Sequence, residues 1–137
     1  MDCIFCKIVH GDIPCVRVFE DERVLAFMDI NPINEGHVLV IPKAHAATIL
    51  EIEAADFAAV AAATHKIAAA VQEALHPDGI NLLQLNGKAA NQVVPHLHVH
   101  IVPRWFKDGV TISQWEIVPG DMNRIKDVAD RIQKALQ

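Results

Sequence analysis

The sequence predicts an α+β fold: one antiparallel sheet of about five strands, a long helix inserted between the third and fourth strands, and a helix at the C-terminus. Two observations lead to this prediction. Short segments with strand-like character follow one another with only short turns between them, which favours antiparallel pairing because parallel strands need a long crossover. One segment, residues 53–75, instead repeats its apolar residues at helical spacing.

Length and composition indicate a single globular domain, residues 1–137. Hydrophobic residues make up 52% of the chain and charged residues 21%, a balance typical of a chain that folds around a core. The net charge of -5, without a cluster of Lys and Arg, argues against nucleic acid or a membrane surface as partner. No leader segment or apolar run of membrane-spanning length occurs, and the three cysteines fit a reducing compartment, so we expect a cytoplasmic protein.

The first half of the chain predicts three strands. Residues 16–20 and 24–29 alternate or run apolar on either side of the turn Asp21-Glu22, which predicts a hairpin. Turn-forming residues then separate this hairpin from a third strand at residues 37–41, which ends at Pro42 because proline cannot donate a backbone hydrogen bond.

The second half begins with the long helix of residues 53–75, whose many alanines favour helix and permit close packing. A fourth strand is predicted at residues 80–86. The final helix begins at Asp121, a residue type that caps helix N-termini. Residues 104–120 show no clear period, so the pattern assigns them no element.

The fifth strand is predicted within residues 94–103 and carries three histidines at alternate positions, His96, His98 and His100. Successive side chains of a strand point to opposite faces, so these imidazoles would share one face about 6.6 Å apart. The apolar residues between them would face the other way. A half-exposed strand with a histidine-rich polar face is the alternative, but three histidines in register favour a chemical role.

Two classes of function follow from this strand. One is an enzyme with a histidine nucleophile, which must be neutral near pH 7 and held in one tautomer. The other is a metal site, either in a hydrolytic zinc enzyme or in a metal-binding module, for which His-x-His supplies two ligands. A zinc hydrolase usually also needs an acid/base carboxylate, and the histidine strand contains none. The residues alone leave both classes open.

Two further segments carry candidate ligands. Cys3 and Cys6 form a Cys-x-x-Cys pair, which indicates either half of a tetrahedral zinc site or two buried thiols. The loop of residues 87–95 supplies donors from Lys88 and Gln92 beside the histidines. It would suit phosphate oxygens, although an ordinary solvated loop is the alternative.

The histidine run resembles the signature of the histidine triad (HIT) nucleotide-binding family, in particular its bacterial branch related to purine nucleoside phosphoramidases. Other segments along nearly the whole chain share the likeness. They are Cys3-Ile4-Phe5-Cys6-Lys7-Ile8, Phe27-Met28-Asp29-Ile30-Asn31-Pro32, Gly36-His37-Val38-Leu39-Val40-Ile41-Pro42-Lys43-Ala44-His45 and His100-Ile101-Val102-Pro103-Arg104.

This resemblance implies a HIT-like sheet and a hydrolase or transferase that cleaves a bond at the α-phosphorus of purine nucleoside phosphoramidates or related adenylyl conjugates. His98 would attack phosphorus and form a nucleotidyl-histidine intermediate, while His100 and His37 would bind the phosphate and stabilise developing charge. The implied substrate-binding residues are Asp29 for the ribose hydroxyls, Asn86 and Gln92 for phosphate oxygens, and Phe5, Phe27 and Ile30 for the base. For the last three residues, plain core packing is the alternative.

The resemblance also implies a structural zinc held by Cys3, Cys6, His45 and His96, and a homodimer paired through the alanine-rich helix and the neighbouring sheet edge. One alternative activity is that of a dinucleoside polyphosphate hydrolase of the same family. The other alternative is a metal-centred function, either a zinc-dependent hydrolase or a metal-binding module that uses the His-x-His strand. The chain departs from many relatives at Val93, where they have a hydroxyl residue after the loop glutamine. This departure bears on rate and on the preferred leaving group.

Overall fold

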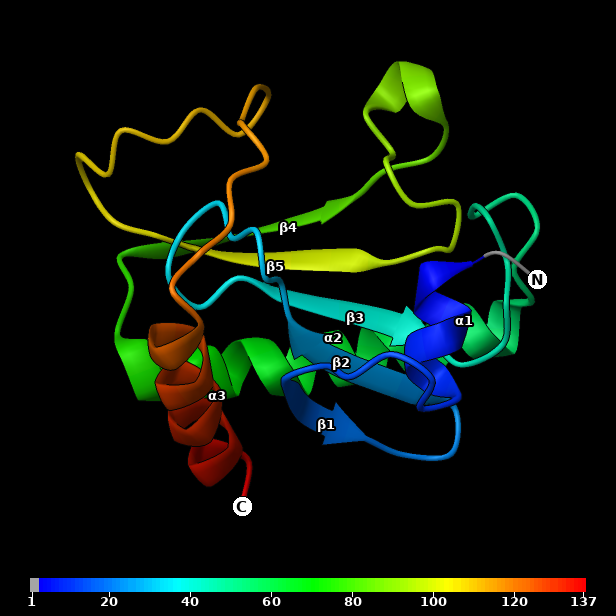
Figure 1. Cartoon of the computed structure of the whole chain (residues 1–137), viewed down its shortest axis with the longest axis horizontal. Helices are drawn as coiled ribbons and strands as arrows, with labels where there is room; N and C mark the ends of the chain where they lie inside the picture. The colour runs from blue at the N-terminus through cyan, green and yellow to red at the C-terminus, as the bar shows by residue number, and fades with distance from the viewer. Residues whose placement is uncertain (1–2) are drawn as a thin grey trace.

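A five-stranded antiparallel sheet with the order β1-β2-β3-β5-β4 forms the centre of the computed structural model (Figure 1). The structure describes residues 3–137; residues 1 and 2 of the predicted domain lie outside the described part. The strands are β1 (Arg17–Glu20), β2 (Val24–Met28), β3 (Val38–Pro42), β4 (Gly79–Gln84) and β5 (Val99–Arg104). The helices are α1 (Ile4–Val9), α2 (Ala54–Leu75), the 3-10 turn η1 (Lys88–Ala90) and α3 (Met122–Leu136). The predicted α+β fold, with the long helix between the third and fourth strands, is confirmed.

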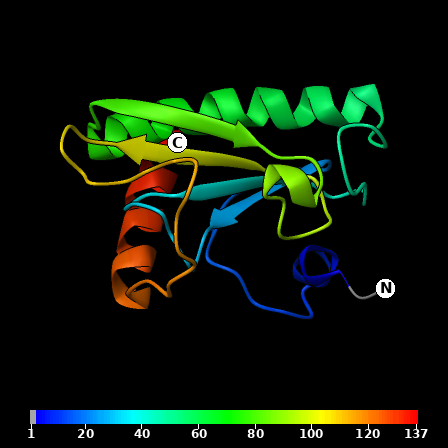
Figure 2. The ribbon, with the colours of Figure 1, turned by 90° about the horizontal axis from the view of Figure 1, so that it is seen from above.

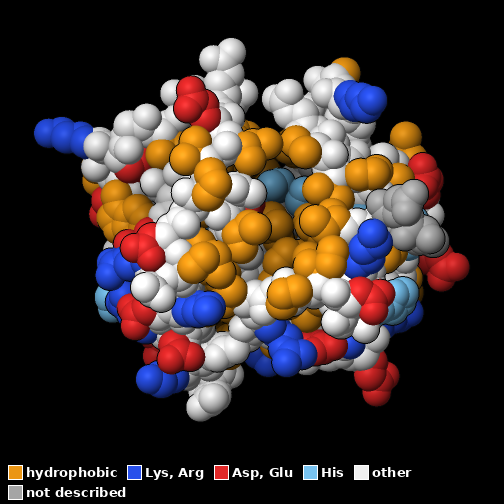
Figure 3. Space-filling view, viewed as in Figure 1, with side chains coloured by type: hydrophobic (Ala, Val, Ile, Leu, Met, Phe, Trp, Pro, Cys, Tyr) orange, Lys and Arg blue, Asp and Glu red, His pale blue; other side chains and the backbone are white. Residues whose placement is uncertain are grey.

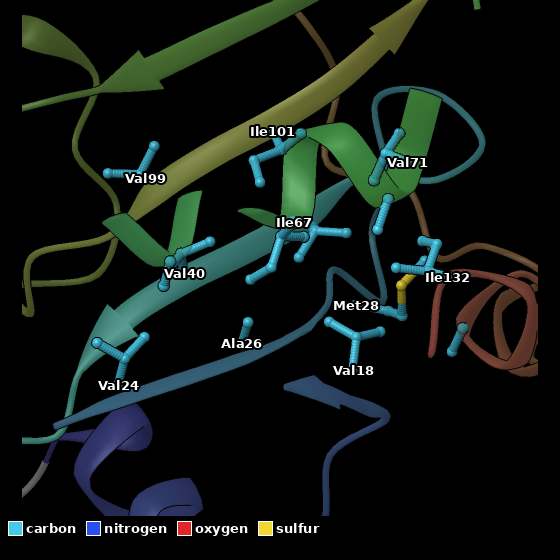
Figure 4. Packing of buried hydrophobic residues seen from close by; sticks show 14 of the residues in the cluster. Val18, Val24, Ala26, Met28, Val40, Ile67, Val71, Val99, Ile101 and Ile132 are labelled. Carbon is cyan, nitrogen blue, oxygen red and sulfur yellow. The ribbon is translucent and has the colours of Figure 1, made fainter. Parts of the chain in front are cut away.

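Helix α2 lies along one face of the sheet, and α1 lies on the other (Figure 2). The main core fills the space between the sheet and α2, and α3 closes it by packing against α2 and β1 (Figure 4). Alternate residues of each strand supply it, so Val40 of β3 and Ile101 of β5 meet Ile67 of α2. Burial of each such side chain stabilises the fold by about 1.5–3 kcal/mol.

The opposite face of the sheet holds a second, smaller core around α1. Leu39 and Ile41 of β3 pack there with Phe5 and Cys6 of α1. Helix α1 is an element that the sequence pattern did not predict, because six residues are too few to show a helical period. Packing on the sheet and the Cys3 side chain, which accepts a hydrogen bond from the Cys6 amide, stabilise it.

The predicted histidine strand of residues 94–103 is wrong at its first half, because β5 begins only at Val99. The ladder between β3 and β5 ends at the pair Val40 and Val99. Beyond this pair, the amide of Leu97 donates instead to the carbonyl of Ala46, 2.8 Å away. His96 and His98 therefore lie in an extended segment before the strand. Both faces of this segment are buried, the side of Leu97 as well as the side of His96 and His98.

Helix α2 is long and apolar enough in composition to span a membrane. Its side chains Val60, Ile67 and Val71 are fully buried in the main core. In this fold α2 is therefore the helix around which the main core is built, with small alanines on much of its remaining surface.

Candidate active site and metal-ligand cluster

A pocket of about 270 Å³ opens on the α1 face of the sheet, and histidine side chains lie at the bottom of a hollow rimmed by apolar groups (Figure 3). Strand alternation places His100 of β5 there, because its neighbours Val99 and Ile101 point into the main core. Six of the predicted site residues line this pocket: Phe5, Phe27, Asp29, Ile30, His98 and His100.

His98 is held in a single tautomer. Its Nδ1 lies 2.7 Å from the carbonyl oxygen of His96, which can only accept, so Nδ1 carries the proton and Nε2 keeps its lone pair. The edge-on ring of Phe5, 5.1 Å away between centroids, supports the imidazole from the side. Burial lowers the pKa of His98, although the hydrogen bond to His96 raises it. His98 is therefore neutral near pH 7 and presents an unprotonated Nε2.

His37 and His100 form a hydrogen-bonded pair whose tautomers are also determined. The amide of Ile33 donates to Nδ1 of His37 (3.0 Å), so His37 carries its proton on Nε2 and donates it to Nδ1 of His100 (2.9 Å). His100 is then left with its proton on Nε2. Burial lowers the pKa of His37 to about 3 and that of His100 to about 3, so both rings are neutral.

The free N–H donor that this pair presents, Nε2–H of His100, suits an anion. His100 lines the pocket and packs against His98, with ring centroids 4.8 Å apart, so its Nε2–H is a donor beside the lone pair of His98. His37 is fully buried, does not line the pocket and acts through His100. Asp29, the third group near this pair, has Oδ2 3.6 Å from Nε2 of His37. Asp29, His37 and His100 lie close enough together to hold a metal ion, but the hydrogen bond between the two imidazoles occupies Nε2 of His37 and Nδ1 of His100.

Asp29 follows β2 directly and lines the pocket together with Ile30. Its Oδ1 accepts the amide of Asn31 at 2.8 Å, and burial raises the pKa of its carboxyl group. Phe5 and Phe27 meet edge to face, 5.5 Å between centroids, and form the apolar end of the pocket. The pocket therefore joins an apolar slot, one carboxylate and two neutral imidazoles.

Asn86 and Gln92 lie outside this pocket, and both amides are already hydrogen-bonded within the protein. The side chain of Gln92 accepts from the Gly87 amide and donates to the carbonyls of Ala47 and Val94. Asn86 accepts from the Ile49 amide and exchanges two hydrogen bonds with Gln84. These contacts hold the loop between β4 and β5, and the predicted bonds to phosphate oxygens stay a prediction.

The pocket also contains residues that the sequence analysis did not single out as site residues. Trp115 lies with its ring centroid 6.1 Å from that of His100, and Ile117 lines the same wall. Both come from residues 104–120, which have no period from which a position could be deduced. Cys15 lines the pocket as well, beside Ile13.

A separate cluster gathers Cys3, Cys6, His45 and His96, the four ligands that the family resemblance implies. Nδ1 of His96 lies 3.4 Å from Sγ of Cys3, 3.6 Å from Sγ of Cys6 and 3.2 Å from Nδ1 of His45, and Cys6 lies 3.3 Å from His45. Zn–S bonds of about 2.3 Å and Zn–N bonds of about 2.0 Å place the ligand atoms of a tetrahedron roughly 3.3–3.8 Å apart. The cluster has the dimensions of a tetrahedral zinc site.

The surroundings of His96 also suit a metal ligand. Its Nε2 donates to the carbonyl of Pro42 at 2.8 Å, which leaves the lone pair on Nδ1, the atom that faces the two thiols. A hydrogen bond from the second ring nitrogen to a carbonyl is the usual support of a metal-bound histidine. The two cysteines and two histidines therefore fit a zinc ion with no open coordination position.

Comparison with known proteins agrees with this geometry. Residues 10–107 match the family model described as HIT domain. The adenosine 5'-monophosphoramidase of Schizosaccharomyces pombe is 40% identical, with 100% of each chain covered. A Hit-like protein of Bartonella henselae superposes with a TM-score of 0.91 at 39% identity, covering 98% of this chain and 96% of that one. A zinc-bound histidine triad family protein of Mycobacterium smegmatis has a TM-score of 0.88 at 39% identity, covering 99% and 94%. This chain belongs to the HIT domain family.

Proposed function

We propose that this protein is a nucleotide hydrolase that cleaves the bond between the α-phosphorus and the departing group of purine nucleoside phosphoramidates or related adenylyl conjugates. The observation that carries the proposal is the neutral His98, whose Nδ1 is bonded to the His96 carbonyl and whose Nε2 is unprotonated in the pocket. The relative from Schizosaccharomyces pombe is named an adenosine 5'-monophosphoramidase, which supports the same reaction class.

In the proposed reaction the Nε2 lone pair of His98 forms a bond to phosphorus while the bond from phosphorus to the departing nitrogen breaks. The departing nitrogen takes a proton from solvent and leaves as an amine. The Nε2–H of His100 donates to a phosphoryl oxygen and stabilises its developing charge, and His37 orients His100. Water then displaces the nucleotide from His98, which releases the nucleoside monophosphate and restores the imidazole.

The remaining pocket residues are proposed to bind the nucleoside. The carboxylate of Asp29 would accept hydrogen bonds from the ribose hydroxyls, and the slot of Phe5, Phe27 and Ile30 would take the base. Both amide hydrogens of Gln92 already bond to carbonyls, so Gln92 would reach phosphate oxygens only by giving up one of these bonds, whereas the Asn86 amide has a second hydrogen to donate. We therefore propose that Gln92 contributes mainly by holding the loop beside the phosphate, and that Asn86 can also donate to a phosphate oxygen.

The cluster of Cys3, Cys6, His45 and His96 is proposed to hold a structural zinc ion. Four protein ligands leave no coordination position for substrate or water, so the metal would stabilise the fold around α1. His96 connects this cluster to the site, because its carbonyl fixes the tautomer of His98. The chemistry itself stays with His98.

A panel of adenylyl donors that differ only in the departing group tests the proposed function. We expect release of AMP, with a burst of a good leaving group before steady turnover because a covalent nucleotidyl-histidine accumulates. Chelation of accessible metal should leave turnover of the folded protein unchanged. Immediate loss of turnover on chelation, with the fold intact, would favour a metal-centred hydrolase, and preference for dinucleoside polyphosphates would favour the alternative activity.

We also propose a homodimer. Strand β4 is at the edge of the sheet and its Leu82 is 54% exposed, while α2, whose outer surface is rich in alanine, packs on the neighbouring strands β3 and β5. A second copy that pairs there would cover both features with an obligate-sized interface. Light scattering at micromolar concentration should give a mass of about 30 kDa, twice the 15.1 kDa of one chain. A mass of a single chain would contradict this prediction.

A further inference from the structure

The hydrogen-bonded pair of His37 and His100 is compatible with two proton arrangements. In one, Nε2 of His37 donates to Nδ1 of His100, and Nε2 of His100 carries a proton that is available to a phosphate oxygen. In the other, both rings have the opposite tautomer, and Nε2 of His100 presents a lone pair that would repel that oxygen. The 2.9 Å distance between the two rings fits either arrangement. The choice between them therefore depends on a group outside the pair.

The backbone amide of Ile33 makes this choice. It donates to Nδ1 of His37 at 3.0 Å, so this nitrogen must accept and the proton of His37 lies on Nε2. Ile33 belongs to the loop of residues 29–37 between β2 and β3, outside any helix or strand. The position of its N–H relative to His37 therefore depends on the contacts that anchor this loop.

Asn34, the next residue of the loop, anchors it to the end of the histidine strand. Its side-chain amide uses both hydrogens, one on the carbonyl of Pro103 at 3.0 Å and one on Oδ2 of Asp108 at 2.9 Å. The backbone carbonyl of Asn34 also accepts the amide of His37 at 3.3 Å. Asn34 thus connects the segment that carries the Ile33 amide to β5 and to the loop that follows it.

Asp108 is a firmly held acceptor for Asn34. Nε and Nη2 of Arg104 lie 2.8 and 3.1 Å from its two carboxylate oxygens, and the amides of Trp105 and Val110 donate to the same group. The Arg104 guanidinium keeps the pKa of Asp108 well below its usual range, so the carboxylate stays charged. The loop after β5 therefore brings a fixed anion beside the loop between β2 and β3 (Figure 1).

A further side-chain contact of the loop between β2 and β3 is weaker. Oε1 of Glu35 lies 2.6 Å from Nε of Arg124 on α3, but this arginine side chain is 59% exposed, so solvent screens the pair. The bond from Asn34 to Asp108 is charge-assisted, and the Asp108 side chain is only 10% exposed. Asn34 is therefore the stronger side-chain anchor of the segment next to Ile33.

We propose that Asn34, held by Asp108, is a positioning residue for the reaction. It keeps the Ile33 amide on Nδ1 of His37, and the proton of His100 thereby stays on Nε2. Asn34 acts at a distance, because it does not line the nucleoside pocket, the pocket that contains His98 and His100. This inference rests on the proposed function, in which Nε2–H of His100 stabilises charge on a phosphoryl oxygen.

A double-mutant cycle tests whether Asn34 acts through His100. Asn34→Ala should lower kcat for adenosine 5′-phosphoramidate by about tenfold to hundredfold, the range for a displaced catalytic group, with a smaller change in KM. In the His100→Ala background the same substitution should change kcat by less than about twofold, because the donor that it orients is already absent. Equal losses in both backgrounds, or full kcat in Asn34→Ala, would overturn the inference.

Proton–nitrogen NMR of protein labelled at histidine reports the tautomers without turnover. In the wild type, His37 and His100 should both carry the proton on Nε2, and Asn34→Ala should move a measurable share of both rings to Nδ1. Asn81→Ala is the matched control, because Asn81 accepts from Arg104 at 2.8 Å on the other side of the same network and lies on β4. It should keep the wild-type tautomers and kcat. Unchanged tautomers in Asn34→Ala would overturn the inference.

A second variant serves if Asn34→Ala does not fold. Asp108→Asn keeps the shape of the acceptor but removes its charge, so it should show the same kcat pattern and the same tautomer shift at smaller size. Failure to release AMP from every adenylyl donor would instead refute the proposed function. The two failures are distinguished, because the tautomers of His37 and His100 are measured independently of turnover.

Discussion

Replacement of His98 by alanine should lower turnover of adenosine 5′-phosphoramidate by roughly four orders of magnitude or more, because removal of a nucleophile abolishes the covalent route. Binding of AMP should persist, since Asp29 and the apolar slot around Phe5 do not depend on the imidazole for their position. Single-turnover kinetics for the chemistry and calorimetry for AMP binding measure the two quantities separately. Rapid quenching of the wild-type protein should trap an adduct that is labile in acid and more stable in base, as a phosphorus–nitrogen bond requires.

His100→Ala is the comparison for this variant. It removes a hydrogen-bond donor to the phosphate but leaves the nucleophile, so we expect a loss of about 10²–10³-fold, the range of a lost charge-stabilising donor. His98→Ala and His100→Ala should therefore differ by at least about tenfold in residual turnover. Near-normal turnover of His98→Ala, or an adduct that maps to another residue, would show that the proposed mechanism is wrong.

Simultaneous replacement of Cys3 and Cys6 by serine should remove bound zinc and lower the melting temperature by about 10 °C or more. A loss of a few kcal/mol corresponds to a shift of this size in a chain of this length. The thiolates supply two of four ligands, and without them His45 and His96 would not retain the ion. Elemental analysis should give about one zinc per chain for the wild type and none for the variant.

Cys15→Ser is the matched control, because this thiol lies outside the ligand cluster. It should keep the metal and change the melting temperature much less than the double substitution. Residual turnover gives an independent reading: the folded double variant, assayed well below its melting temperature, should still form the His98 adduct. Full retention of zinc by the double variant, or absence of zinc from carefully purified wild-type protein, would contradict the proposed site.

The local pattern of apolar and capping residues in the sequence was sufficient to predict most of the helices and strands. The helical spacing of residues 53–75 places α2 within one residue of its observed start, and Asp121 accepts amide hydrogen bonds at the start of α3 as predicted. The histidine strand was placed too early because its alternation continues through residues 94–98, which have no partner strand. Helix α1 was not predicted because it is stabilised by packing on β2 and β3 rather than by its own sequence.

The sequence by itself determined which side of each strand faces the main core, because alternation is a property of neighbouring residues. It also placed His98 and His100 on the side away from that core. Which nitrogen of each imidazole carries a proton was decided only by the tertiary structure. The carbonyl of His96 and the amide of Ile33 are the partners that determine it, and only the folded chain fixes their positions.

The Cys/His cluster and the nucleoside pocket show the same division between what the local sequence determines and what the tertiary structure decides. The sequence shows the Cys-x-x-Cys pair, but only folding brings Cys3 to within 3.4 Å of Nδ1 of His96, 93 residues away. Likewise Trp115 belongs to a segment without any period, and its place against His100 comes from the path of a loop across the sheet. Periodicity is encoded within a few residues, whereas these contacts depend on long-range chain closure, so only the tertiary structure could decide them.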